Sequence, residues 1–191
     1  MQTNPLSPEH QRFIHHTQKW VKDVIMKYNI CPFARKEVEN DSIRYAVIEQ
    51  TKIKMIIKNL IDECQLLDKQ NTIETSLLIF PRGFEGFYDY LDLVDRANDA
   101  LFGKGYEGQY QLASFHPDYC FEDEAQSDAA NYTNRSPYPT LHIIREASME
   151  RALSEYNDPE SIPERNIAFA RKKGSDFFER LLAQCHQASS K

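Results

Sequence analysis

The stretch Ser76-Leu77-Leu78-Ile79-Phe80 decides the fold class of this chain, and Pro81-Arg82-Gly83 ends it. A short, continuous apolar run of this kind is typical of a strand that is buried on both faces of a sheet. Proline and glycine directly after the run favour a turn. We therefore predict a central strand here, with helices covering the sheet to which it belongs.

Strand and helix patterns alternate along the rest of the chain. The strands show β-branched or period-two runs, and the helices show an apolar face with a spacing of three or four residues. The predicted strands are 43–50, 76–80, 109–116 and 140–145, and the predicted helices are 8–28, 51–67, 87–103, 148–158 and 163–185, the last with a kink or break at Gly174. This alternation predicts an α/β fold: a mainly parallel or mixed four-stranded sheet covered by helices, with an N-terminal and a C-terminal helix.

Length and composition bound the class of protein. With 191 residues, of which 41% are hydrophobic and 27% charged, the chain fits one domain, taken as 1–191 with a frayed tail after about residue 187. The net charge of −6 and the lack of a Lys- or Arg-rich run argue against nucleic acid and anionic membrane as partners. The sequence shows no signal peptide and no apolar stretch of about 20 residues. These features favour a cytoplasmic protein.

Residues 117–139 form the longest segment without a helix or strand pattern. Connections longer than about 12–15 residues are usually either functional or disordered. Aromatic and proline residues suit a packed loop better than a solvated linker. The segment contains Pro117, Tyr119, Phe121, Tyr132, Pro137, Tyr138 and Pro139. We therefore predict an ordered loop that carries the function, between about Phe115 and His142.

Two histidines flank this loop and are the first candidate catalytic residues. His116 falls at the carboxyl end of its predicted strand, where open α/β sheets gather ligands, and Asp118 could orient its imidazole as a general base or a metal ligand. If the two strands are neighbours, period-two counting lets His116 and His142 converge. A hard cation held with the acidic loop residues is a further option, although their spacing matches no calcium or zinc motif. The structural alternative is that His116 caps a main-chain group and His142 is a satisfied core residue.

Amide, hydroxyl and guanidinium donors around the loop suggest an anion site. Arginine grips a carboxylate or phosphate through two hydrogen bonds, and amide or hydroxyl groups add further donors. The alternative is that Asn and Ser build turns while Arg pairs with neighbouring acids. The candidate substrate-binding residues are Asn131, Asn134, Arg135, Ser136, Tyr138 and Arg145.

The four cysteines lie far apart and form no CxxC pair, which argues against a zinc ribbon or a disulfide framework. Cys64 and Cys185 lie on apolar helix faces and are predicted core residues. Cys31 follows the first helix at its negative C-terminal end, which disfavours a thiolate and favours a buried structural role. Arg35 or a distant histidine beside it would instead make Cys31 a catalytic or redox thiol.

Residues 103–108 fit the G-x-G-x-x-G pattern of dinucleotide-binding proteins. That pattern requires a strand before it and a helix after it, whereas these residues follow a predicted helix and precede a predicted strand. We interpret them as a turn between the two elements.

Three segments are similar to a bacterial family catalogued as domain of unknown function 1415: Cys31-Pro32-Phe33-Ala34, residues 105–117 and residues 131–142. The resemblance covers nearly the whole chain. It implies membership of the family but no activity or cofactor, so no catalytic role is transferred from it.

The sequence supports three hypotheses of function. The first is an enzyme that acts on a small anionic metabolite, a carboxylate or phosphate, through the 115–142 loop, with His116 as general acid or base. The second is a binding or regulatory module whose Tyr- and Pro-rich loop recognises a protein partner or a second copy of the chain. The third is a thiol redox protein acting through Cys31. Residue types specify neither a cofactor nor a metal.

Overall fold

A four-stranded sheet forms the centre of the protein. The computed structural model describes residues 6–187. The strands are β1 (Ile43–Val47), β2 (Thr75–Ile79), β3 (Tyr110–Phe115) and β4 (Thr140–Arg145), in the order β1-β2-β4-β3. β1 pairs with β2 in parallel, and β4 lies antiparallel between β2 and β3, so three strands run in one direction and β4 runs in the other. The predicted α/β fold with a four-stranded, mixed sheet is confirmed.

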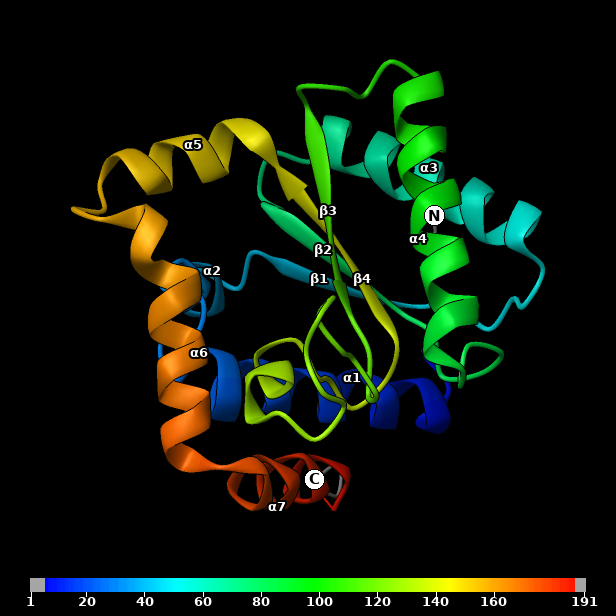
Figure 1. The fold of residues 1–191 in the computed structure, drawn as a ribbon. Helices are drawn as coiled ribbons and strands as arrows, with labels where there is room; N and C mark the ends of the chain where they lie inside the picture. The colour runs from blue at the N-terminus through cyan, green and yellow to red at the C-terminus, as the bar shows by residue number, and fades with distance from the viewer. Residues whose placement is uncertain (1–5, 188–191) are drawn as a thin grey trace.

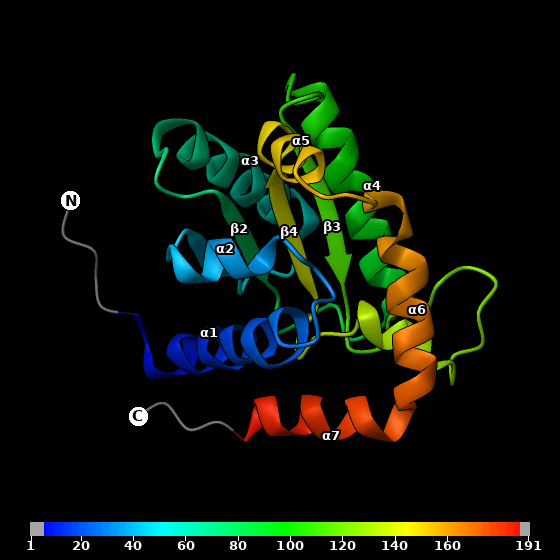
Figure 2. The same cartoon turned by 90° about the vertical axis from the view of Figure 1, so that its left-hand side faces the viewer.

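Helices cover the sheet on both sides (Figures 1 and 2). α3 (Ile53–Lys69) and α4 (Phe87–Gly103) pack against one face, and α1 (Pro8–Trp20), α2 (Ala34–Glu39) and α5 (Glu146–Ser154) lie on the other. α6 (Ile162–Lys173) and α7 (Ser175–His186) complete the second side, where α7 runs beside α1. Two short 3-10 turns, Ala129–Thr133 and Pro159–Ser161, lie in the connections. The predicted N-terminal and C-terminal helices are confirmed.

The first predicted helix forms as two joined segments. Ser7 caps it, since its side chain accepts a hydrogen bond from the His10 N–H at 3.1 Å, and Pro8 occupies the first turn. After Trp20 the helix continues as a π-helical segment, Val21–Met26. The chain leaves the helical path at Asn29, which has a left-handed φ of 55°. Residues 8–26 thus form one continuous helical element that packs against one face of the sheet.

Each face of the sheet has its own apolar core. All five residues of β2 are buried, as the apolar run predicted. The core against α3 and α4 includes Cys64, Leu78 and Tyr90, and the core against α1, α6 and α7 includes Trp20, Leu77 and Cys185. Cys64 and Cys185 are 0% and 1% exposed, so the prediction that both belong to the core is confirmed.

Several element boundaries sharpen or correct the sequence predictions. The break at Gly174 is confirmed: this residue has a φ of 79° and separates α6 from α7. Residues 103–108 connect α4 to β3, as expected of a turn. Ser148 does not cap its helix, because α5 begins at Glu146 directly after β4. The short helix α2 was not predicted at all. The tail after residue 187, predicted to fray, lies outside the described residues.

No helix within residues 6–187 has the length and apolar character that crossing a membrane requires.

Candidate functional site

The 117–139 loop is packed, and its polar side chains hold it in place. Asn131 is 0% exposed; its Oδ1 accepts from the Phe121 N–H at 3.0 Å, and its Nδ2 donates to the Ala125 carbonyl at 2.9 Å. Arg135 donates to the carbonyl oxygens of Tyr119 at 3.1 Å and Gln126 at 2.8 Å. These donors bind main-chain groups within the loop, so the contacts give Asn131 and Arg135 a structural role.

The remaining polar candidates of the loop are also engaged. Asn134 Nδ2 donates to the Ser114 carbonyl at 3.4 Å, and Ser136 Oγ donates to the Tyr138 carbonyl at 2.6 Å. The Tyr138 hydroxyl lies 2.7 Å from Nδ1 of His16, on α1. An anion-binding role for these residues stays a prediction without support from their contacts.

The outer edge of the loop is tied to helix α6. Arg171 forms ion pairs with Glu124 at 2.8 Å and with Asp128 at 3.0 Å. Tyr132, the central aromatic residue, is 5% exposed and stacks beneath Arg135, whose guanidinium carbon lies 4.3 Å from the ring centroid. Tyr132 is therefore not part of an exposed aromatic surface, whereas Tyr119 and Tyr138 are partly exposed.

His116 is completely buried, and both of its ring nitrogens bind the main chain. Nε2 donates to the Phe84 carbonyl at 2.9 Å, and Nδ1 accepts from the Asp118 N–H at 3.0 Å. Asp118 thus orients the imidazole through its main chain and not through its carboxylate. Burial lowers the pKa of His116, so the ring is neutral near pH 7. The arrangement agrees with the structural alternative for this residue.

The two histidines lie on opposite faces of the sheet, so the expectation that they converge is wrong. The strands that carry them are neighbours, but the register pairs Ala113 with His142. Directly paired residues in antiparallel strands point to the same face, which places His142 with Ala113 and Phe115. His116 follows Leu112 and Ser114 on the other face, where it packs against Phe87 of α4 at 5.3 Å between ring centroids.

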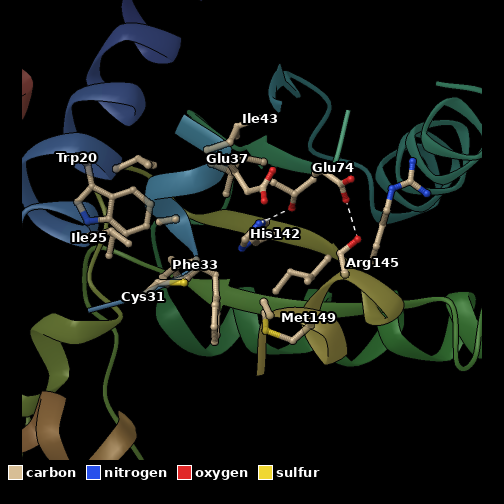
Figure 3. Close-up of a pocket in the computed structure, with 18 residues that line it drawn as sticks. Trp20, Ile25, Cys31, Phe33, Glu37, Ile43, Glu74, His142, Arg145 and Met149 are labelled. Carbon is tan, nitrogen blue, oxygen red and sulfur yellow. Dashed lines mark hydrogen bonds between the residues drawn. The ribbon is translucent and has the colours of Figure 1, made fainter. Parts of the chain in front are cut away.

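A pocket lies on the His142 side of the sheet, between α1, α2 and α5 (Figure 3). Its cavity volume is about 130 Å³, which is the space of roughly four water molecules. The floor consists of strand residues, and the walls come from the three helices and the segment before α2. Most of the lining is apolar, including Trp20, Ile25, Phe33, Leu77, Phe115 and Met149.

His142 lies at the centre of this pocket, with Cys31 and Phe33 on one side and Glu74 on the other (Figure 3). The Thr75 hydroxyl lies 2.5 Å from Nε2 of His142 and 2.6 Å from the Ile143 carbonyl. A hydroxyl has one proton, and the carbonyl can only accept it. Thr75 therefore donates to Ile143 and accepts from His142, which assigns the proton of the neutral imidazole to Nε2.

Nδ1 of His142 is left as a hydrogen-bond acceptor. Within residues 6–187 no group donates to it. Burial lowers the pKa of His142 to about 4, because the charged form loses its solvation. The ring is therefore neutral at pH 7, and it keeps one lone pair free beside the cavity.

Two carboxylates complete the polar part of the pocket. Ser42 Oγ donates to Oε2 of Glu37 at 2.5 Å, and Ser148 Oγ donates to Oε2 of Glu74 at 2.7 Å. Arg145 also lines the pocket, but Figure 3 shows its guanidinium turned away from His142, towards α3. There it donates to the carbonyl oxygens of Leu67 and Ile73 and to the Tyr110 hydroxyl. Its donors are thus used at the end of α3.

Cys31 borders the pocket immediately before α2. Burial raises the pKa of its thiol, while hydrogen bonds from the main-chain N–H groups of Phe33 and Ala34 act in the opposite direction. The net effect keeps the thiol protonated near neutral pH. A redox or nucleophilic role needs a lowered pKa, so this environment does not favour the third hypothesis.

The pocket brings together three of the predicted site residues and separates them from the rest. Cys31, His142 and Arg145 line it, whereas His116, Asp118 and the loop residues do not. Sequence reasoning missed Glu37, Glu74, Thr75, Ser148 and the aromatic walls. Glu74 directly precedes β2 and Thr75 is the first residue of that strand, at the strand end opposite to the one where ligands were expected. The sequence alone could not place Glu74 and Thr75 near His142, because this requires knowing that β4 pairs with β2 and runs antiparallel to it.

The fold and the pocket define an α/β protein with a small, mainly apolar cavity against one face of a mixed sheet. The chain belongs to the family described as Protein of unknown function (DUF1415), whose model matches residues 12–180. The resemblance found in the sequence is thereby confirmed. No curated protein and no solved structure matches the chain.

Proposed function

We propose that the protein binds a small, mainly apolar molecule in the pocket between α1, α2 and α5, and that His142 accepts a hydrogen bond from it. One observation carries this proposal. His142 is a neutral imidazole whose Nε2 proton is held by Thr75, and its Nδ1 has no donor among the described residues. A single acceptor in the wall of an apolar cavity gives a ligand one directed hydrogen bond, which fixes its orientation.

The rest of the pocket supports the same function. Ligand sites are typically concave and apolar, with a few placed polar groups that fix the orientation of the ligand. Trp20, Phe33 and Phe115 provide the apolar surface, and His142 provides the orienting group. None of the residues 117–139 lines this pocket, so the proposal moves from the 115–142 loop to the other end of β4.

The proposal includes a cytoplasmic location for the protein. All four cysteines are free thiols, which suits a reducing cytoplasm. The bacterial source stays an expectation from the family resemblance.

The test compares two ligands of the same shape, indole and benzothiophene, by ligand-observed NMR. Indole carries an N–H donor that benzothiophene lacks, so we expect indole to bind about 3- to 10-fold more tightly, the value of one hydrogen bond. His142→Phe removes the acceptor and keeps an aromatic ring in place. This variant should bind both compounds equally.

His15→Phe is the matched control, because His15 lies on α1 outside the lining of the pocket. It should keep the preference for indole. The proposed function is wrong if indole and benzothiophene do not compete for one site, or if His142→Phe does not change their binding to that site.

A further inference from the structure

We infer that the ligand of this pocket is an organic cation: an apolar molecule that carries a protonated amine, held between the carboxylates of Glu37 and Glu74. The inference rests on the proposed function and adds the charge of the ligand. It concerns the polar end of the pocket, where the apolar walls stop.

Neither carboxylate forms a direct ion pair among the described residues, although Arg151 donates to Ser148, whose hydroxyl binds Glu74. Glu37 and Glu74 each accept a hydrogen bond from a serine hydroxyl through Oε2, which leaves Oε1 open. Within residues 6–187, no Lys, Arg or His nitrogen lies within 4.0 Å of either carboxylate. Carboxylates of this chain elsewhere often have such partners: Glu63 pairs with Arg44 at 2.8 Å, and Asp128 pairs with Arg171. The two pocket acids are therefore available to an incoming cation.

The other charged group of the pocket does not balance them. The guanidinium of Arg145 binds the carbonyl oxygens of Leu67 and Ile73 and the Tyr110 hydroxyl. This position near the C-terminal end of α3 suits a cation, because the last carbonyl groups of a helix carry partial negative charge. Arg145 is thus committed to the helix end and does not offer a donor to a ligand.

The neutral residues of the pocket also fit a cation. His142 is uncharged at pH 7 and presents only a lone pair, to which an ammonium N–H can donate. Aromatic faces attract cations through their ring quadrupole, and Trp20, Phe33 and Phe115 line the cavity. An anion would instead meet two like charges and no free donor from Arg145.

The first experiment measures how binding depends on ligand charge, with benzylamine, benzyl alcohol and benzoate as probes of one size. We expect benzylamine to bind about 10-fold or more tightly than benzyl alcohol, since a charge pair in a partly enclosed site exceeds 1.4 kcal/mol. Benzoate should bind most weakly. Glu37→Gln/Glu74→Gln should reduce the advantage of benzylamine to about 2-fold or less.

The control is Glu39→Gln/Glu150→Gln, which removes the same charge from exposed positions on α2 and α5 outside the pocket. It should leave the preference for benzylamine intact. Equal binding of benzylamine and benzyl alcohol to the wild type overturns the cation inference and leaves the proposed function standing. If none of the three probes binds, and indole does not bind either, both conclusions are wrong.

Cys31 allows a second measurement that needs no variant. Methanethiosulfonate reagents are available with a trimethylammonium or a sulfonate group, and peptide mass spectrometry reports their rates at Cys31. After division by the rates with free glutathione, we expect the cationic reagent to label Cys31 at least about 5-fold faster, because the negative charges of Glu37 and Glu74 in the same pocket attract the trimethylammonium group and repel the sulfonate. Equal rates, or faster labelling by the sulfonate, would contradict a cation-selective pocket.

Discussion

The 117–139 loop and the pocket on the other face of the sheet both contain polar side chains that resemble a functional site, but they use them differently. In the loop, Asn131 and Arg135 bind carbonyl and N–H groups of the same segment. In the pocket, His142 keeps one nitrogen open, and Glu74 has one bound and one open oxygen. A candidate residue is therefore better judged by the hydrogen bonds it has left than by its type.

The difference follows from how the two regions satisfy their main chain. Strands and helices pair their own N–H and C=O groups, whereas a long buried loop has to find other partners for them. Here side chains supply those partners, and residues 129–133 add a 3-10 turn capped by Asp128. The pocket is lined mostly by helices and strands whose main chains are already paired, so Nδ1 of His142 and one oxygen each of Glu37 and Glu74 remain open to a ligand.

Among the substitutions considered, we expect Arg135→Ala to lower the free energy of unfolding the most. Arg135→Ala removes two hydrogen bonds to main-chain carbonyl groups and the stacking on Tyr132. Because these contacts are buried, we expect a loss of about 3 kcal/mol in the free energy of unfolding, measured by urea denaturation.

Arg180→Ala is the control for this variant, since Arg180 is exposed on α7. It should change stability by less than about 0.5 kcal/mol. If Arg135→Ala is as stable as Arg180→Ala, Arg135 does not stabilise the loop. Its guanidinium would then again be a candidate for binding an anion.

The sequence predicted the elements of this fold better than its site. The bounds of β4 agree with the prediction of 140–145, and the positive φ at Gly174 matches the predicted break. Both are local features, set by side-chain period and by glycine. α2 was missed because six residues give less than two helical turns, too few to show an amphipathic period.

The site depended on long-range features that no local pattern contains. Strand order places β4 beside β2, and the register pairs Leu77 with His142, which joins residues 65 positions apart in one pocket. The same register sends His116 to the opposite face. Glu37, Glu74 and Ser148 meet only because α2, β2 and α5 pack around one cavity. His142 and Cys31, which residue type marked as catalytic candidates, both line the pocket, but without His116 and the loop residues expected beside them.

His142 should make the stability of the protein depend on pH. The pKa of His142 falls from its usual 6.5 to about 4 on folding. Between pH 6.5 and 4, the imidazole of His142 is therefore protonated in the unfolded chain but uncharged in the folded protein. Its contribution to stability is complete above about pH 6.5 and is lost as the pH falls towards 4. We expect this residue to contribute about 2 kcal/mol of that loss, less than the full shift implies because its edge borders the pocket.

His142→Gln isolates this contribution, because the amide can still donate to Thr75 but does not titrate. Urea denaturation at pH 7.5, 5.5 and 4.5 should show a flatter stability curve for the variant than for the wild type. His116 also has a lowered pKa and remains in both proteins, so it cancels in the difference. Identical curves would show that folding does not shift the pKa of His142, and would contradict the burial of an uncharged ring at this position.

The smallest expected effect comes from Arg171, the second arginine that holds the loop. Arg135 is buried and binds main-chain groups of the loop. Arg171 is an exposed residue of α6, and it pairs with Glu124 and Asp128 of the loop. Exposed ion pairs gain little, because water and salt screen them. We expect Arg171→Ala to lower the urea midpoint only slightly at about 0.15 M salt, and not at all at about 1 M salt. A loss that equals that of Arg135→Ala, or that persists at high salt, would mean that the clamp from α6 orders the loop as strongly as its internal hydrogen bonds do.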